Sequence, residues 1–327
     1  MKLPKNGEEM NRRQLIQSMA FVTAACSAPL SRVFAMPRPQ SEGVGFKAVA
    51  YNHISYDVPD YTKGREFYAD LFGLKVGYDD GKQCSVEGSE PISRIYVRNL
   101  NRGNNPPPPG TKPYIDHFCF SIANYDSEAV LGELKRRNLD PKPDGKHSWT
   151  FKNPDGITMH ITWDGDVYPG QTSPEGEFTG PVPPQPADEQ KAPFRVAAMS
   201  TVIRTPDISS SRDFYMSLLG MKKIYEDNDQ CFLAFGPSEN NLVIRKIQQP
   251  DEKAHIESFG FTIADFKQSK VEAELKRRGL APEAYSSYAF TVQDPDGTKF
   301  IIARKGLLEF LGKNCHGSAS TCPAGKG

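Results

Sequence analysis

Residues 65–73 read REFYADLFG, and residues 212–220 read RDFYMSLLG. In the first stretch the apolar residues recur at helical spacing, and Gly73 suits the position just past a helix end, where the backbone turns left-handed. The second stretch repeats this helix 147 positions later. Such a repeat indicates that the chain carries two copies of one domain.

Two further motifs repeat downstream of these helices. The sequence ELKRR at 133–137 recurs at 274–278, and NPDG at 153–156 recurs as DPDG at 294–297. Both pairs are 141 positions apart, so the second copy is six residues shorter between its helix and these motifs. We expect the extra residues of the first copy to form a surface loop at the proline-rich segment 106–109.

The repeats predict two domains, at 46–165 and 195–304. Between them, residues 166–194 are rich in proline and glycine, a composition typical of an extended linker. Residues 305–327 are expected to form a tail after the second domain.

The first 36 residues are expected to be an export signal. An arginine pair within NRRQLI at 11–16 precedes an apolar run at 19–25 and a small-residue cleavage pattern. The NRRQLI stretch resembles a bacterial twin-arginine signal, which predicts an exported, periplasmic protein. The alternatives are an ordinary cytosolic N-terminus, or lipid attachment at Cys26.

The overall composition excludes some partners. Among 327 residues, 40 basic side chains balance 40 acidic ones without a basic stripe, which argues against binding to nucleic acid. The apolar run near the N-terminus is too short to span a membrane, so no membrane span is predicted. Cys315 and Cys322 either close a disulfide loop or remain free thiols.

Within the first copy, alternating apolar residues predict strands at 52–58 and 115–122, and helical spacing predicts helices at 61–72 and 127–138. Each copy thus contains the order strand, helix, three strands, twice. The fold class is α+β, with two tandem domains that are each a pair of βαβββ modules. Each pair is expected to form an eight-stranded open cup, with helices over its apolar face and a concave opposite face.

Three of the six histidines occupy matching places in the first copy. His53 and His117 lie on the first strand of each half, and His160 lies on the last strand. Each alternates with apolar neighbours, so all three are expected to point to the concave face. Imidazoles in this arrangement predict one divalent transition metal, of which iron, manganese, zinc and nickel are candidates. The alternative is that histidine is simply tolerated on a solvated sheet face.

Both copies resemble the vicinal oxygen chelate superfamily, which includes glyoxalases, extradiol dioxygenases, fosfomycin-resistance transferases and bleomycin-binding proteins. The resemblance lies in the helix ending FYxxxFG or FYxxLLG and in the NPDG turn. It implies metal ligands on the first strand of each half and on the last strand. His53 and His117 fit this pattern, whereas His160, four residues after Gly156, replaces the family's usual glutamate.

The second copy serves as an internal comparison. Ser200, Ser258 and Ile301 stand where the first copy has its three histidines. These side chains do not form a metal-binding set. We therefore expect the second copy to have a structural or substrate-shaping role.

Three other residues are candidates for the chemistry. His147, in a Gly-x-His stretch similar to one in extradiol dioxygenases, is a candidate general acid or base, or else a solvated loop histidine. Arg94 and Tyr96 lie on the strand where glyoxalases place a carboxylate ligand, which neither can supply. Arg94 is a candidate partner for an anionic substrate, or else a surface arginine.

Three neutral ligands leave the charge of a divalent metal uncompensated, which favours a small anionic substrate that chelates through adjacent oxygens. The sequence therefore predicts a metal-dependent enzyme, with a dioxygenase as the leading reaction class. A binding protein that sequesters a small molecule, as bleomycin-resistance proteins do, and a lyase or isomerase are the alternatives. Both a monomer with internal domain pairing and a homodimer fit two copies in one chain.

Overall fold

The computed structural model describes most of the two predicted domains. The export signal, most of the proline-rich loop, most of the linker and both tail cysteines lie outside the described residues. The described ranges are 44–88, 94–101, 108, 110–145, 147–163 and 192–314.

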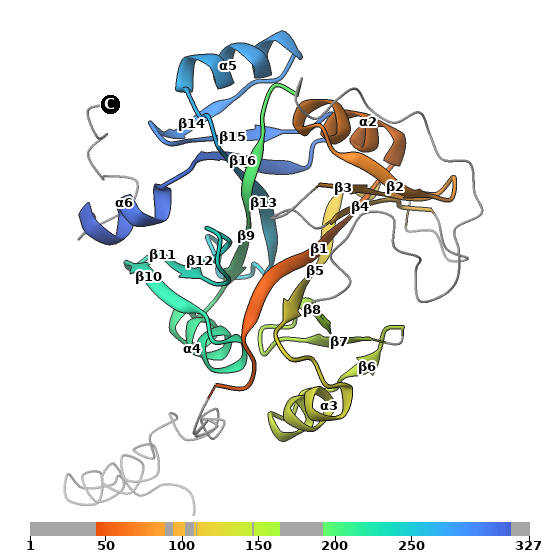
Figure 1. Cartoon of the computed structure of the whole chain (residues 1–327), viewed down its shortest axis with the longest axis vertical. Helices are drawn as coiled ribbons and strands as arrows, with labels where there is room; N and C mark the ends of the chain where they lie inside the picture. The colour runs from red at the N-terminus through yellow and green to blue at the C-terminus, as the bar shows by residue number, and fades with distance from the viewer. Residues whose placement is uncertain are drawn as a thin grey trace, which may run out of the picture. The chain divides into compact units, whose positions relative to one another are not determined.

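The first copy folds into one eight-stranded mixed sheet with the order β2-β3-β4-β1-β5-β8-β7-β6 (Figure 1). Two βαβββ modules meet where the first strands of both modules, β1 and β5, pair antiparallel. The elements are β1 (Ala48–Val58), α2 (Tyr61–Phe72), β2 (Lys75–Asp79), β3 (Gln83–Glu87), β4 (Arg94–Asn99), β5 (Tyr114–Ile122), α3 (Ser127–Arg136), β6 (Lys142–Pro143), β7 (Ser148–Lys152) and β8 (Thr158–Trp163).

The second copy repeats this topology with the order β10-β11-β12-β9-β13-β16-β15-β14. The predicted α+β fold with two tandem eight-stranded domains is therefore confirmed. Its elements are β9 (Val196–Thr205), α4 (Ile208–Leu219), β10 (Lys222–Glu226), β11 (Gln230–Ala234), β12 (Asn241–Lys246), β13 (His255–Ile263), α5 (Gln268–Arg277), β14 (Glu283–Ser286), β15 (Ala289–Gln293) and β16 (Lys299–Arg304). A further helix, α6 (Leu307–Asn314), lies in the segment expected to be a tail.

The repeated motif has the same start and stop signals in both copies. The Asp60 side chain accepts a hydrogen bond from the Thr62 backbone at the start of α2, and Asp207 caps α4 through the Ser210 backbone. Gly73 ends α2 with a φ of 66°, a left-handed conformation that costs glycine little. Helix α3 ends two residues earlier than predicted, because the chain turns left-handed at Asn138 (φ 58°).

The two faces of the first sheet differ in chemistry. Ile54 and Tyr56 point into the hydrophobic core, and both side chains are fully buried. Ser55, between them in sequence, faces the opposite, polar side of the pleated strand. Burial of the apolar face fixes which residues face the concave side, because a slip of one residue would exchange the two faces.

Reciprocal hydrogen bonds join the two copies. The Tyr68 hydroxyl on α2 donates to Asp294 Oδ2 in the second copy's DPDG turn, at 2.9 Å. The equivalent Tyr215 hydroxyl on α4 accepts a bond from Asn153 Nδ2 in the first copy's NPDG turn, at 3.0 Å. The helix and turn motifs that repeat in sequence therefore contact each other across the two copies.

A second reciprocal pair involves the repeated ELKRR motif. Arg137 Nη1 donates to Ser217 Oγ on α4 at 2.8 Å. The equivalent Arg278 forms an ion pair with Asp70 on α2, at 2.6 Å. The internal pairing of the two copies accordingly rests on the residues that identified the repeat.

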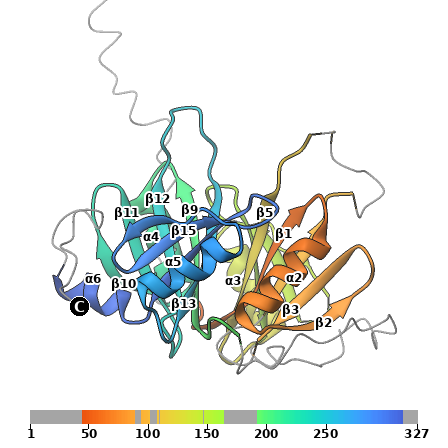
Figure 2. The ribbon, with the colours of Figure 1, turned by 90° about the horizontal axis from the view of Figure 1, so that it is seen from above.

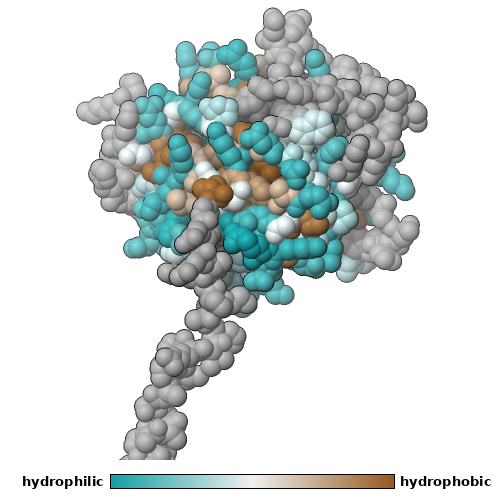
Figure 3. Space-filling view, turned by 60° about the horizontal axis from the view of Figure 1, so that its bottom comes forward, coloured by the Kyte–Doolittle hydropathy of each residue, from teal (hydrophilic) through white to brown (hydrophobic). Residues whose placement is uncertain are grey.

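Little apolar surface is exposed on the described part of the chain. Its exposed large hydrophobic side chains are Val44, Tyr114 and Trp163. On the face in Figure 3, brown apolar residues lie among teal hydrophilic ones. None of the described helices is long and apolar enough to cross a membrane.

Loss of either tyrosine hydroxyl should weaken the pairing of the copies. We expect Tyr68→Phe and Tyr215→Phe each to lower the free energy of unfolding by about 1–2 kcal/mol, since each leaves a buried polar partner unsatisfied. Urea unfolding monitored by circular dichroism measures this change. The control is Tyr78→Phe, because the Tyr78 hydroxyl donates to the exposed Asp80. An equal loss of stability in this control would contradict the account.

Candidate metal centre

Three adjacent strands bring the three histidines together. Across β1, β5 and β8, Cys119 is the register partner of both His53 and His160. His117 lies two residues before Cys119 on the middle strand and therefore on the same face. The three imidazoles thus occupy the corners of a small triangle on the concave face.

The imidazole nitrogens are close enough to share one ion. One ring nitrogen from each of His53, His117 and His160 lies within 4.8 Å of the others. Nε2 of His53 and Nε2 of His117 are 3.0 Å apart. Two nitrogens bound at right angles to one metal, each about 2.1 Å from it, stand about 3 Å apart, so this geometry fits a metal-binding group.

An oxygen contacts the outward nitrogen, Nδ1, of every imidazole. For His53 and His117 these contacts are hydrogen bonds, and Nε2 of both rings points inward, as in protein metal sites where a carboxylate or amide holds the far side of the ligand. The His160–Asp144 contact is close but lies outside hydrogen-bond geometry. The contacts are Asn52 Oδ1 to His53 at 2.9 Å, Asp116 Oδ2 to His117 at 2.7 Å, and Asp144 Oδ2 to His160 at 3.0 Å.

The surroundings keep two of the rings uncharged. Burial, followed by the charges of His117 and His160, lowers the pKa of His53 well below its usual value. Burial also lowers the pKa of His117 to about 4, although the adjacent Asp116 opposes the change. Neutral imidazole is the form that binds metal, so both rings are ready to bind near pH 7.

The other predicted site residues have different environments. The Tyr96 ring meets the His53 ring edge to face, with centroids 5.0 Å apart, and so borders the centre. Arg94 is neutralised by the buried Glu87, with Nε 3.1 Å from Oε1. His147 does not belong to the three-imidazole group, and its ring packs against Trp163 at 5.0 Å.

Sequence reasoning missed four polar residues near the centre, Asn52, Asp116, Asp144 and Arg98. Asp116 directly precedes a ligand candidate, a signal that was available. Asp144 follows the short strand β6 and reaches the centre only through the fold, so no local pattern indicates it. Arg98 continues the alternation of Arg94 and Tyr96 on β4, and its guanidinium lies over the Tyr96 ring, 5.3 Å from the centroid.

In the second copy, apolar side chains occupy the corresponding face. Leu308 and Leu311 of α6 pack in a cluster with Val202, Phe232 and Val243 of that sheet. Helix α6 contacts β10, as Figure 2 shows. Apolar side chains of the second copy itself therefore cover this part of its concave face. This agrees with the replacement of the three histidines there.

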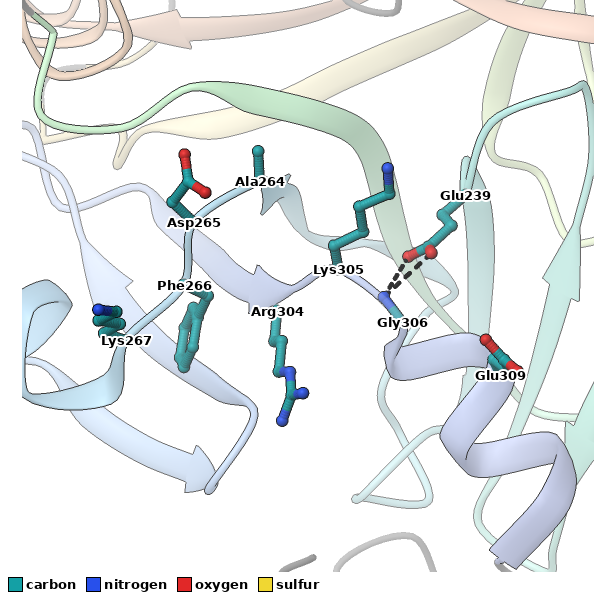
Figure 4. A pocket seen from close by; sticks show the side chains of 9 residues that line it. All are labelled: Glu239, Ala264, Asp265, Phe266, Lys267, Arg304, Lys305, Gly306 and Glu309. Atoms are coloured by element: carbon teal, nitrogen blue, oxygen red, sulfur yellow. Dashed lines mark hydrogen bonds between the residues drawn. The ribbon is translucent and has the colours of Figure 1, made fainter. Parts of the chain in front are cut away.

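The hollow drawn in Figure 4 is a separate feature of the second copy. The Glu239 carboxylate at its edge accepts bonds from the Gly306 backbone at the start of α6. None of its lining residues belongs to the three-imidazole group. They are Glu239, Ala264, Asp265, Phe266, Lys267, Arg304, Lys305, Gly306 and Glu309.

Metal content should depend on the three histidines together. We expect the full chain, purified without a histidine tag, to bind one equivalent of a divalent transition metal, and alanine at His53, His117 or His160 to abolish that binding. Elemental analysis after dialysis measures the content. His147→Ala and His255→Ala are controls that should retain full metal, and loss of metal in either would indicate a different ligand set.

The carboxylates behind the rings should strengthen metal binding without touching the ion. We expect Asp116→Asn and Asp144→Asn each to weaken metal affinity about 10–100-fold, as is typical when such partners are removed. Competition with a chromogenic chelator measures the affinity. The exposed Asp140, paired with Lys142, gives the matched control Asp140→Asn, and equal affinities in all three variants would contradict this role.

Comparisons with known proteins agree with the fold. The family model described as "Glyoxalase/Bleomycin resistance protein/Dioxygenase superfamily" matches residues 198–302, which lie in the second copy. No curated protein sequence matches the chain.

Among solved structures, the Mn(II)-bound glyoxalase from Novosphingobium aromaticivorans is similar with a TM-score of 0.56 and 16% identity, over 79% of this chain and 83% of that chain. The 2,3-dioxygenase LapB from Pseudomonas sp. KL28 has a TM-score of 0.56 and 16% identity, over 79% and 93%. Homoprotocatechuate 2,3-dioxygenase from Brevibacterium fuscum, in complex with 3,4-dihydroxyphenylacetate, has a TM-score of 0.57 and 13% identity, over 81% and 82%.

At these identities the structural likenesses establish the fold alone. The repeated topology extends that fold to both copies. Together with the family match over residues 198–302, it shows two tandem domains of the vicinal oxygen chelate fold.

Proposed function

We propose that the chain is a metal-dependent enzyme whose centre in the first copy acts on a small anionic substrate that chelates through two adjacent oxygens, and that it works as a dioxygenase. The observation that carries this proposal is the convergence of three imidazole nitrogens within 4.8 Å. Three protein ligands leave further coordination positions for a substrate. The likeness in fold to two 2,3-dioxygenases supports the reaction class.

The residues of the chain have distinct roles in this proposal. His53, His117 and His160 hold the ion, which supplies Lewis-acid and redox chemistry when bound. Tyr96 forms an aromatic wall beside His53 and restricts where a planar substrate can lie. His147 is proposed as an acid or base that moves protons during turnover, although its ring lies against Trp163 in this structure.

The charge around the centre differs from the sequence-based expectation in one respect. The three ligands are neutral, but Asp116 and Asp144 stand one contact further out. Two carboxylates at this distance offset much of a divalent charge, so the ligand set alone does not account for a preference for anions.

The proposal also covers the location of the protein and its oligomeric state. We propose export to the periplasm by the twin-arginine-like signal, and a monomer whose two copies pair internally. The reciprocal Tyr68–Asp294 and Asn153–Tyr215 bonds support internal pairing.

Metal identity and oxygen consumption together test the reaction class. With iron or manganese bound, we expect oxygen uptake on addition of a catechol. Zinc or nickel without oxygen uptake would support a lyase or isomerase instead. Metal-independent binding of an aromatic ligand, without turnover, would support sequestration.

A charge change in the ligand set gives a further prediction. His160→Glu restores the family's usual carboxylate and adds one negative charge beside the substrate. We expect it to weaken binding of a chelating anion about tenfold, or about 1.4 kcal/mol, measured by calorimetry with the metal-loaded protein. The charge-matched control is His255→Glu, at an exposed position of the second copy, which should leave the affinity for the anion unchanged. Tighter binding of the anion by His160→Glu would refute the charge argument.

A further inference from the structure

We propose that Arg98, with Tyr96, forms a subsite for a carboxylate on the substrate, so that the substrate class is a chelating compound with a separate anionic group. The chelation part rests on the proposed function, whereas the anionic subsite stands on the observations below.

Within the described part of the chain, the Arg98 guanidinium forms no ion pair at contact distance, and Asp144 acts on it only at longer range. Its Nε is buried without a hydrogen-bond partner there. The guanidinium carbon lies over the Tyr96 ring, 5.3 Å from the ring centroid. A partly buried cation without a counter-ion is costly, and an anionic ligand would remove this cost.

The nearby carboxylates have other partners. Glu87 pairs with Arg94 at 3.1 Å, and Asp144 contacts His160 at 3.0 Å. Asp57, the register partner of Arg98 on β1, is fully buried and has interactions of its own. Arg98 is therefore the cation on this face that is left for a ligand, among the residues described.

The second copy provides an internal control. Arg245 occupies the position of Arg98 in the repeat, and there Glu257 neutralises it at 3.2 Å. The residue equivalent to Glu257 in the first copy is Asp116, whose shorter side chain contacts His117 at 2.7 Å instead. Among the residues described, the repeated arginine thus forms an ion pair where the metal ligands are missing and none where they are present.

The position of Arg98 suits a substrate that reaches the metal. The Tyr96 ring contacts both the Arg98 guanidinium, at 5.3 Å, and the His53 ring, at 5.0 Å. A flat substrate could chelate the ion with one end and pair with Arg98 at the other. Guanidinium binds carboxylate through two parallel hydrogen bonds, which adds orientation as well as affinity.

Charge accounts for the selectivity. Asp116 and Asp144 together offset a divalent ion, so beside the Tyr96 ring the positive charge of Arg98 is what attracts a second anionic group of the ligand. A chelator with a carboxylate should therefore bind better than the same chelator without one.

The test measures binding of three probes to the full chain, loaded with manganese and kept free of oxygen, by isothermal calorimetry. Catechol can only chelate, phenylacetate can only pair with a cation, and 3,4-dihydroxyphenylacetate can do both. For the unaltered protein, we expect the last to bind about 10–100-fold more tightly than catechol, the range of a charge-assisted bidentate pair.

Arg98→Met should reduce this ratio to within about threefold, while leaving catechol affinity unchanged. Arg98→Lys keeps the charge but loses the bidentate geometry, so it should give an intermediate ratio. Arg245→Met is the matched control in the second copy and should bind all probes normally, because Arg204 and Lys299 still pair with Glu257. An unchanged thermal unfolding midpoint confirms that each variant is folded.

The outcomes separate the subsite from the proposed function. Equal affinity for catechol and 3,4-dihydroxyphenylacetate, or a ratio unaffected by Arg98→Met, overturns the subsite. If catechol does not bind but both carboxylates bind in an Arg98-dependent manner, the subsite stands and the chelating function fails.

Discussion

The pairing of β1, β5 and β8 determines the position of the metal centre. Because these strands are neighbours, and because Cys119 is in register with both His53 and His160, three residues far apart in sequence meet on one face. The register itself is held by the apolar face, where Ile54 and Phe118 are fully buried. A slip of one residue would turn an imidazole into the hydrophobic core, so the site and the core specify the same register.

The two copies share one fold but differ in what covers the concave face of the sheet. In the first, the concave face carries imidazoles whose outer nitrogens are held by Asn52, Asp116 and Asp144. In the second, α6 places Leu308 and Leu311 against that face, and the apolar cluster stabilises the sheet without an ion. The reciprocal contacts between Tyr68 and Asp294 and between Asn153 and Tyr215 make the second copy part of the scaffold for the first.

Sequence reasoning reached the fold and the three histidines because both depend on local periodicity. A repeat distance shows the duplication, and alternation along a strand shows which face His53, His117 and His160 share. It missed contacts that depend on distant segments meeting in space. Asp144 reaches His160 from a different strand pair, and the availability of Arg98 depends on Asp116 contacting His117, whereas Glu257 in the second copy pairs with Arg245. Helix α6 was missed because its own segment, after the last repeated strand, showed no sequence match to the first copy.

X-ray absorption spectroscopy of the metal-loaded protein tests the central claim most directly, because it reports the atoms bound to the ion. The account predicts three imidazole nitrogens at about 2.0–2.2 Å, with oxygen atoms in the remaining positions. The signal of one imidazole should be lost in each single alanine variant of His53, His117 and His160. A spectrum with fewer than three imidazoles, or one unchanged by these substitutions, would contradict a shared centre in the first copy.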